Sequence, residues 1–204
     1  MIQGLIIEGM STAGKTSVLS ALKKAHGQAA NVPRTMIALS EHYSQVLHDD
    51  HGEPRRLQQE EHLNLMQPHI NYLEHLFLWS GSLGHSKLSN GAFYILERFH
   101  LNHRAAFGDS AEIKALERRL SGLNAQCVLL TLSPETVESR YIESRGEGWK
   151  SYVMQGHSSV SKAVQHFLEA QENLRKCAGQ SLIPTVEIQT DDAEWDKYAQ
   201  QLLM

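Results

Sequence analysis

The chain has 204 residues, of which 41% are hydrophobic and 21% charged, so it can bury one sizeable core, and we expect a single domain over residues 1–204. A formal net charge of −4 and a pI near 6.3 argue against a protein that coats nucleic acid or an anionic membrane, because such binding needs a broad basic surface. The sequence has no basic and apolar leader and no run of about 18 apolar residues, so neither export nor membrane spanning is indicated, and we expect a cytoplasmic protein.

Short apolar runs alternate with longer amphipathic stretches along the chain. Near-continuous hydrophobicity over about five residues is typical of strands that are buried on both faces of a parallel sheet. We therefore expect strands at residues 4–8, 35–39, 92–96, 126–132 and 185–189. Helices are expected where apolar residues recur every three or four positions, at residues 16–26, 63–77, 113–123, 160–174 and 195–202, and after the Pro134 start signal. This alternation predicts an α/β fold with a layered sheet.

The first expected strand leads directly into GMSTAGKT at residues 9–16, which has the pattern G-x-x-x-x-G-K-[ST]. Gly9 and Gly14 permit the backbone to approach a phosphate closely, and the helix that follows adds its positive end. Lys15 would reach the terminal phosphates, and the Thr16 hydroxyl would bind Mg²⁺. We therefore expect ATP and Mg²⁺ as cofactors. The expected nucleotide-binding residues are Gly9, Met10, Ser11, Thr12, Ala13, Gly14, Lys15, Thr16 and Ser17.

The third expected strand ends in an acid followed by a base, Glu97 and Arg98. The carboxyl ends of the strands are where ligands bind in open α/β sheets. Glu97 would accept the proton of an attacking hydroxyl or hold Mg²⁺ through water, and Arg98 would bind a phosphate or the acceptor. A surface ion pair is the alternative interpretation. The sequence has no N-K-x-D or D-x-x-G motif, which disfavours a GTPase.

Three segments together resemble the deoxynucleoside kinase and thymidylate kinase branch of the P-loop kinases. They are IIEGMSTAGKT at residues 6–16, LERF at residues 96–99 and TLSPETVESRYIESRG at residues 131–146. The resemblance implies a three-layer P-loop fold with a five-stranded parallel sheet in the order 2-3-1-4-5. It also implies ATP- and Mg²⁺-dependent phosphoryl transfer to a small acceptor that carries a hydroxyl or a phosphate.

The resemblance further implies a lid near residues 140–158 that closes over the phosphates. Lids of this family usually carry two arginines four residues apart, whereas Arg140 and Arg145 are five apart. On an α-helix that step turns about 140° beyond a full turn, so the two guanidinium groups would not share a face. We therefore assign Arg145 to catalysis with Lys15 and interpret Arg140 as a surface residue. Whether Arg140 or Lys150 joins the lid stays open.

By the same resemblance, the acceptor would lie above the sheet, near the exit of the second strand. Glu41 resembles the acid that contacts the sugar of a nucleoside, although a helix-capping acid is the alternative. His103 and Arg104 follow the catalytic pair and would face an anionic acceptor. The expected acceptor-binding residues are Glu41, Arg98, His103 and Arg104. Phe77 and Trp79 would stack on a base, but core packing is the interpretation that we favour for them.

These observations favour a kinase of a nucleoside or nucleotide, whose partner is a small-molecule acceptor. A sugar, an antibiotic or a nucleic-acid 5′ end is the alternative acceptor, and an ATP-binding sensor without catalysis is the alternative class. Membranes and nucleic acid are not expected as partners, and a homodimer is left open. Cys127 and Cys177 have no CxxC spacing, so we expect both to be reduced packing residues.

Overall fold

The computed structural model describes residues 2–30, 32–50, 53–82 and 91–203, without the side chains of residues 49, 50, 53 and 54. Its centre is a five-stranded sheet in which every neighbouring pair of strands is parallel. The strands are β1 (Ile2–Gly9), β2 (Thr35–Leu39), β5 (Ala92–Glu97), β6 (Ala125–Thr131) and β7 (Thr185–Gln189).

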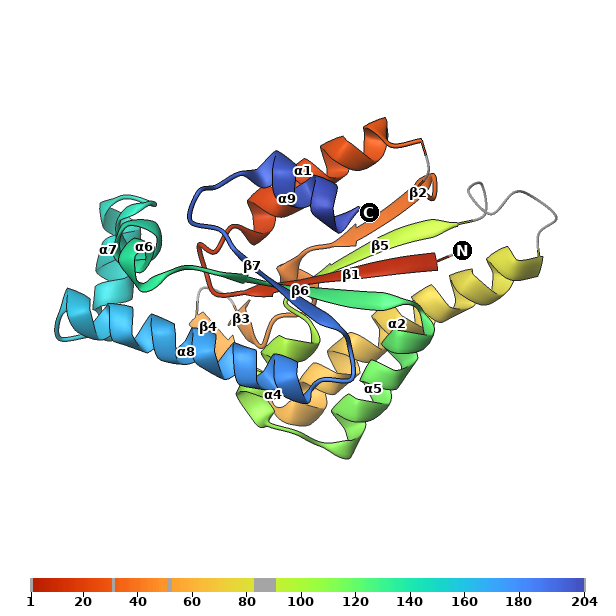
Figure 1. The fold of residues 1–204 in the computed structure, drawn as a ribbon. Coiled ribbons are helices and arrows are strands. Elements are labelled where there is room, and N and C mark those ends of the chain that lie inside the picture. Colours follow the sequence, from red (N-terminus) through yellow and green to blue (C-terminus); the bar gives the residue numbers. More distant parts are fainter. Residues whose placement is uncertain (1, 31, 51–52, 83–90, 204) are drawn as a thin grey trace.

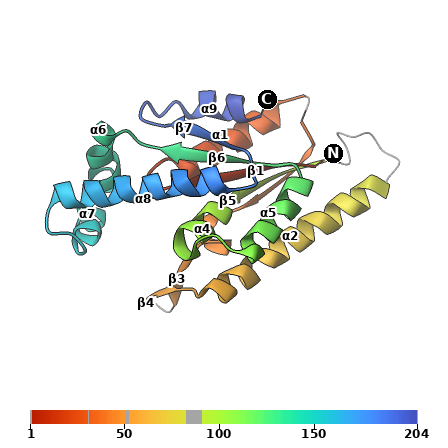
Figure 2. The ribbon, with the colours of Figure 1, turned by 60° about the horizontal axis from the view of Figure 1, so that its bottom comes forward.

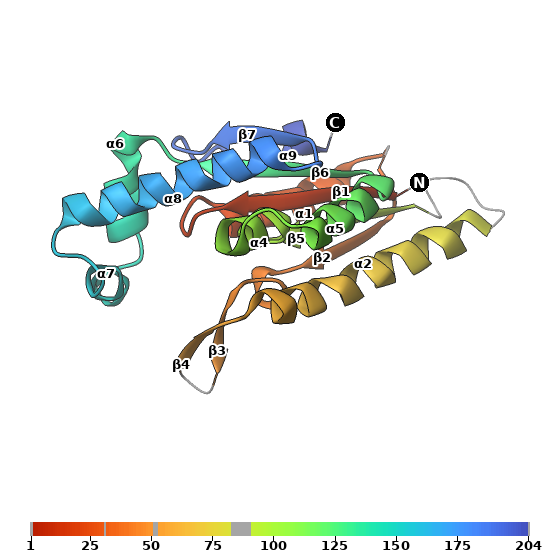
Figure 3. The ribbon, with the colours of Figure 1, turned by 90° about the horizontal axis from the view of Figure 1, so that it is seen from below.

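The spatial order of the sheet is β2-β5-β1-β6-β7. Counted along the chain within this sheet, that is the expected order 2-3-1-4-5, so the predicted fold class is confirmed. The labels differ from this count because a small antiparallel hairpin, β3 (Leu47–Asp50) with β4 (Glu53–Arg56), comes between β2 and β5. The hairpin projects from the body of the protein toward the end where α7 also lies (Figures 2 and 3).

Helices cover both faces of the sheet (Figure 1). One face carries α1 (Lys15–Gln28) and α9 (Trp195–Leu202). The other face carries α2 (Gln59–Ser82), α4 (His100–Phe107), α5 (Ala111–Gly122) and α8 (Val160–Gln180). Beyond the sheet lie a 3₁₀ turn (Glu41–Tyr43), α6 (Pro134–Val137), a π-helical segment (Glu138–Glu143) and α7 (Glu147–Met154).

The core consists of two main apolar clusters, one on each face of the sheet. Ile6 of β1 packs with α2, α4, α5 and α8, whereas its neighbour Ile7 packs with α1 and α9. Successive strand residues point to opposite faces, so a strand covered on both faces must be apolar throughout. This explains why the strands are recognisable in the sequence as short continuous apolar runs.

The β3–β4 hairpin and helix α4 were not predicted from the sequence. The hairpin has no alternation of apolar and polar residues, so nothing in its sequence indicates a strand pair. Helix α4 begins in a polar stretch, and its start is held from a distance: Glu8 Oε1 accepts hydrogen bonds from the backbone N–H groups of Phe99 and Leu101, at 2.8 and 2.9 Å. A helix start stabilised by a side chain about 90 residues away cannot be recognised from local sequence.

Two further findings concern the cysteines and the membrane. Cys127 and Cys177 are both free thiols in the apolar cluster that includes α2, as expected for packing residues. Among the residues that the structure describes, no helix combines the length and the hydropathy needed to cross a bilayer.

Candidate active site

The loop after β1 depends on its two glycines. Gly9 and Gly14 have φ angles of 144° and 96°, a region that residues with side chains rarely adopt. Neighbouring atoms also exclude a side chain: a Cβ at Gly9 would lie 2.6 Å from the carbonyl oxygen of Leu130, and one at Gly14 would lie 2.4 Å from the ring of Trp195. The loop leads directly into α1, whose first amide groups form the positive end of the helix and attract anions.

Lys15 lies across this loop. Its Nζ atom donates hydrogen bonds to the carbonyl oxygens of Gly9 and Met10, at 3.2 and 3.1 Å, and lies 3.6 Å from Glu41 Oε2. Burial, followed by the nearby charge of Arg98, lowers the pKa of Lys15 to about 8. A negative charge added next to this buried ammonium group would therefore stabilise its charged form.

Two carboxylates and one guanidinium group meet beside Lys15. Arg98 Nε lies 2.7 Å from Glu41 Oε2, and Arg98 Nη2 donates to Ser11 Oγ at 2.9 Å. Glu97 accepts a hydrogen bond from the backbone N–H of Glu41 at 3.3 Å through Oε2. Its other oxygen, Oε1, is buried and has no hydrogen-bond partner among the described residues. Glu97 thus has one carboxylate oxygen without a partner, but the residue is buried and lines neither of the two cavities described below.

The two carboxylates differ in their affinity for protons. Burial, and then the negative charge of Glu41, raises the pKa of Glu97 above its usual value. Burial also acts to raise the pKa of Glu41, but the positive charges of Lys15 and Arg98 outweigh it and lower that pKa. Glu41 is thus held ionised by its neighbours, whereas Glu97 is the better proton acceptor of the two.

A cavity of about 310 Å³ opens above the loop. It is lined by Ser11, Thr12, Gly14, Lys15, Thr16, Ser17, Glu41, Arg98, Arg140, Ser144 and Arg145. Of the other expected nucleotide-binding residues, Gly9 offers its carbonyl oxygen to Lys15, while Met10 and Ala13 pack against apolar clusters. The cavity therefore gathers backbone amides, hydroxyl groups and four cationic side chains around one space.

A second cavity of about 630 Å³ adjoins the first and shares Ser11, Glu41, Arg98 and Arg145 with it. Its other walls come from the hairpin and the two residues before it, from α4, from the π-helical segment and from α7. They are Gln45, Val46, Leu47, Arg56, Asn102, Ala105, Ala106, Tyr141, Trp149 and Tyr152. Three aromatic side chains and the additional Arg56 distinguish this space from the first cavity.

Arg140 lies in the first cavity beside Arg145, so its interpretation as a surface residue is wrong. The segment from Glu138 to Glu143 is a π-helix, in which hydrogen bonds join residues five apart instead of four. Arg140 lies in this segment and Arg145 in the turn just after it, and both line the first cavity, so the regular α-helix assumed in the sequence analysis is not present between them. Lys150 does not line either cavity.

Arg140 connects the lid to the loop and to the start of α9. It donates hydrogen bonds to the carbonyl oxygens of Thr190 and Thr12, at 3.1 and 3.4 Å. Its guanidinium carbon lies 5.3 Å from the ring centre of Trp195, the same ring that faces Gly14. The first cavity is thus bounded by segments from both halves of the chain.

His103 and Arg104 do not reach either cavity, so the expectation that they face the acceptor is wrong. His103 is fully buried, and its Nδ1 lies 2.8 Å from Nδ1 of His62. Arg104 is also buried and binds Glu117 through Nε and Nη2, at 2.6 and 2.8 Å, and Asp109 through Nη1 at 2.7 Å. Because α4 turns these side chains inward, Arg104 joins α4 to α5 instead of binding a ligand.

Glu8 is a residue near the site to which the sequence analysis assigned no role. Its bonds to Phe99 and Leu101 hold the turn that follows Arg98. Arg98 itself has a φ angle of 49°, a strained conformation for a residue with a side chain. Glu8 therefore positions Arg98. The sequence signal for this role was an acid inside an otherwise apolar strand, because a buried charge requires partners.

Comparisons with known proteins address the fold. No protein-family profile matches the chain, and a search of curated proteins found no match. Among solved structures, the chain is similar to the YorR protein of Bacillus subtilis in complex with phosphorylated GDP. The two sequences are 16% identical. The match covers 98% of this chain and 93% of the YorR chain, with a TM-score of 0.51.

The chain has the three-layer α/β P-loop fold that the sequence analysis expected. Two shikimate kinases also match, with lower TM-scores. The enzyme from Bacteroides thetaiotaomicron is 16% identical over 98% of this chain and 95% of that chain, with a TM-score of 0.41. The enzyme from Acinetobacter baumannii, in complex with shikimate, is 12% identical over 100% of this chain and 92% of that chain, with a TM-score of 0.47. The superposition with the YorR protein shows a shared fold alone, so the acceptor has to be inferred from the site.

Proposed function

We propose that the protein transfers the γ-phosphoryl group of ATP to a nucleoside or nucleotide, as in the deoxynucleoside and thymidylate kinase branch. The observation that carries this proposal is the junction of the two cavities. A phosphate-binding loop forms one cavity, the second has aromatic walls, and Glu41, Arg98 and Arg145 belong to both. A donor phosphate in the first and an acceptor in the second would meet at these residues.

The chain offers a group for each part of this reaction. Lys15, Arg140 and Arg145 surround the first cavity and would neutralise the phosphates. The acceptor oxygen would form its bond to the γ-phosphorus as the bond to the ADP oxygen breaks. Where the acceptor is a nucleoside, the proton of its hydroxyl would pass to Glu97, whose unpartnered oxygen and raised pKa suit this role, whereas an ionised phosphate oxygen of a nucleotide would need no such base.

The residues present also fit Mg²⁺. Thr16 lines the first cavity at the start of α1, and Glu97 keeps one oxygen without a partner. Hydroxyl and carboxylate oxygens are the ligands that Mg²⁺ prefers, and it usually keeps several waters. When bound, Mg²⁺ would supply charge neutralisation for the phosphate oxygens.

The second cavity supports a nucleoside or nucleotide over a sugar. Tyr141, Trp149 and Tyr152 offer flat faces on which a base can stack, and Arg56 offers a cation for an anionic group. Arg56 donates to the carbonyl oxygen of Ala106, and among the described residues it has no carboxylate partner. A kinase of nucleic-acid ends would need a broader basic surface than a chain with a net charge of −4 offers.

The test is a screen of nucleosides, nucleotides and sugars with ATP and Mg²⁺, with ADP release as the measurement and Lys15→Ala as the blank. We expect a nucleoside or nucleotide to raise ADP release above the blank. Glu97→Gln should lower turnover by about 100-fold or more while the ATP affinity stays the same. The exposed Glu143→Gln serves as the matched control. If no compound raises ADP release, the sensor alternative is preferred over a kinase.

A further inference from the structure

Glu41 lies at the boundary between the two cavities, and its carboxylate contacts both cations there. Glu41 Oε2 lies 3.6 Å from Lys15 Nζ and 2.7 Å from Arg98 Nε. All three residues line the first cavity, and Glu41 and Arg98 also line the second. With the donor in the first cavity and the acceptor in the second, the γ-phosphoryl group has to pass this boundary. The carboxylate of Glu41 therefore occupies the place that this group needs.

Glu41 does not use the full binding capacity of the two cations. Lys15 has three N–H donors, of which two bond to the carbonyl oxygens of Gly9 and Met10. Its 3.6 Å contact with Glu41 is too long for a hydrogen bond. The N–H group at Arg98 Nε is buried and forms no well-directed hydrogen bond with a described residue, although Glu41 Oε2 is close. The three terminal oxygens of a phosphate can satisfy both donors together, which one carboxylate oxygen does not do.

Of the two carboxylates at the site, Glu41 is the one that can give way. It belongs to a three-residue 3₁₀ turn after β2, and 30% of its side chain is exposed, whereas Glu97 of β5 is 3% exposed. The positive charge of Arg98 lowers the pKa of Lys15, so the two cations repel each other and an anion between them is stabilising. Glu41 or a phosphate can supply that negative charge, but the two anions repel each other in the same place.

We propose that the γ-phosphate must displace the carboxylate of Glu41 from Lys15 and Arg98, so that Glu41 weakens the binding of a nucleoside triphosphate more than that of a diphosphate. In this loop pattern the backbone amides hold the α- and β-phosphates, and the lysine reaches the β- and γ-phosphates. A diphosphate therefore fills the loop without needing the place of Glu41. The inference rests on the proposed function, because it takes the junction of the two cavities as the place of transfer. Glu41 is then a specificity-determining residue for the donor.

The first test is calorimetric binding of ADP and of an ATP analogue with a non-hydrolysable imido bridge between its β- and γ-phosphates. EDTA is present, so the loss of a carboxylate cannot act through Mg²⁺. Glu41→Gln should tighten binding of the analogue about tenfold and that of ADP by less than about threefold. An analogue affinity that falls, stays the same or rises by the same factor as that of ADP overturns the proposal.

This assay needs neither an acceptor nor turnover, so its failure differs from a failure of the proposed function. A protein that phosphorylates an acceptor, but whose preference between the two nucleotides does not change in Glu41→Gln, refutes this inference alone. A wild type that binds neither nucleotide refutes both.

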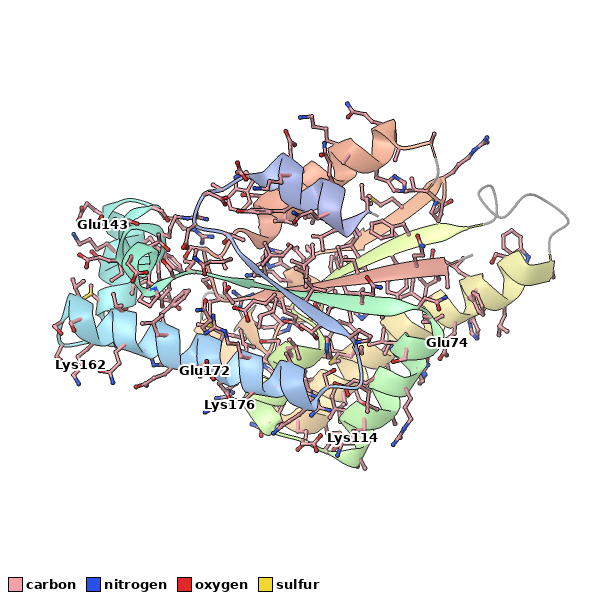
Figure 4. All side chains as sticks on the ribbon, in the orientation of Figure 1. Glu74, Lys114, Glu143, Lys162, Glu172 and Lys176 are labelled. Atoms are coloured by element: carbon pink, nitrogen blue, oxygen red, sulfur yellow. The ribbon has the colours of Figure 1, made fainter. Side chains whose placement is uncertain are left out.

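Glu74→Gln is the matched control and should leave both affinities unchanged. Glu74 also pairs with an arginine, Arg119, at 2.7 Å, and Figure 4 shows it on the opposite side of the protein from the lid residue Glu143. It lies in the outer part of α2, where no described residue after Leu73 is buried. Phe77 and Trp79 in this part are 39% and 63% exposed, so the core-packing interpretation of these two residues is wrong.

The second test uses the wild type, so it does not depend on the folding of a variant. The backbone N–H groups of Ser44 and Gln45 donate to the carbonyl oxygen of Glu41, at 3.1 and 2.8 Å. Displacing the Glu41 side chain should loosen this turn. Amide hydrogen exchange over residues 41–45 should therefore be at least about threefold faster with the ATP analogue than with ADP. Exchange that is equal or slower with the analogue overturns the proposal.

Discussion

The buried acid Glu8 should make the protein less stable as the pH rises from about 4.5 to 7. Burial raises the pKa of Glu8 from 4.5 to about 7 in the folded protein. A folded-state pKa above the unfolded one means that the folded state binds the proton more tightly between about pH 4.5 and 7. Above pH 7 the carboxylate is ionised in both states, and the folded state is destabilised by the full free energy of burying its charge. A shift of this size corresponds to about 3 kcal/mol.

Glu8→Gln should remove this cost, because the amide oxygen can still accept the hydrogen bonds from Phe99 and Leu101. The assay is urea unfolding of variant and wild type from pH 4 to 8. The difference in unfolding free energy should be near zero at about pH 4.5 and grow to about 3 kcal/mol in favour of the variant above pH 7. Buried His103, whose pKa is lowered to about 4, acts in the opposite direction in both proteins and cancels in this difference. The pKa of His100 is also lowered to about 4, but its Nδ1 lies 3.7 Å from Glu8 Oε1, so its contribution changes with the substitution and is measured separately in His100→Phe.

A difference that does not change with pH would refute the reasoning, because it would show that the proton affinity of Glu8 is not raised by folding. A variant that is less stable than the wild type at pH 8 would show that the carboxylate charge itself holds the turn after Arg98. Glu143→Gln, at an exposed position, is the control and should leave the pH profile unchanged.

Three other predictions concern the loop, the lid and the buried ion pair. Gly14→Ala should lower the free energy of unfolding by at least about 1 kcal/mol and abolish ATP binding measured by calorimetry, whereas Gly148→Ala, with open space around it, should do neither. Arg140→Ala should raise the ATP dissociation constant about tenfold, whereas Lys150→Ala should leave it unchanged. An unchanged value for Arg140→Ala would show that Arg140 does not bind ATP. Arg104→Met should cost about 3 kcal/mol in urea unfolding, because it leaves a buried carboxylate without its partner, and a loss below about 1 kcal/mol would contradict that role.

The parts that could be predicted from the sequence depend on local rules. The strands are short apolar runs because both faces of the sheet are covered. The phosphate-binding loop is defined by a stretch of eight consecutive residues, 9–16. Gly9 and Gly14 are needed for their own backbone angles, so their role can be predicted from the local sequence. These features required no knowledge of the rest of the chain.

The errors arose where distant segments decide the outcome. Arg140 and Arg145 line one cavity because a π-helix followed by a turn stands where a regular α-helix was assumed, and no local rule distinguishes the two. Arg104 points inward because Glu117, on the next helix, offers it a buried carboxylate. The acid of an Arg–Glu pair can come from any other element, so the difference between a binding arginine and a structural one depends on tertiary packing.

The hydroxyl of Thr190 donates a hydrogen bond of 2.8 Å to the carbonyl oxygen of Ala13, across 177 positions of the chain. Trp195 covers Gly14 from the same region. During synthesis on the ribosome, the amino-terminal segment emerges long before these supports exist. Any stabilisation of the folding chain by a bound nucleotide would therefore have to wait until residues 190–195 have been synthesised and folded against the loop.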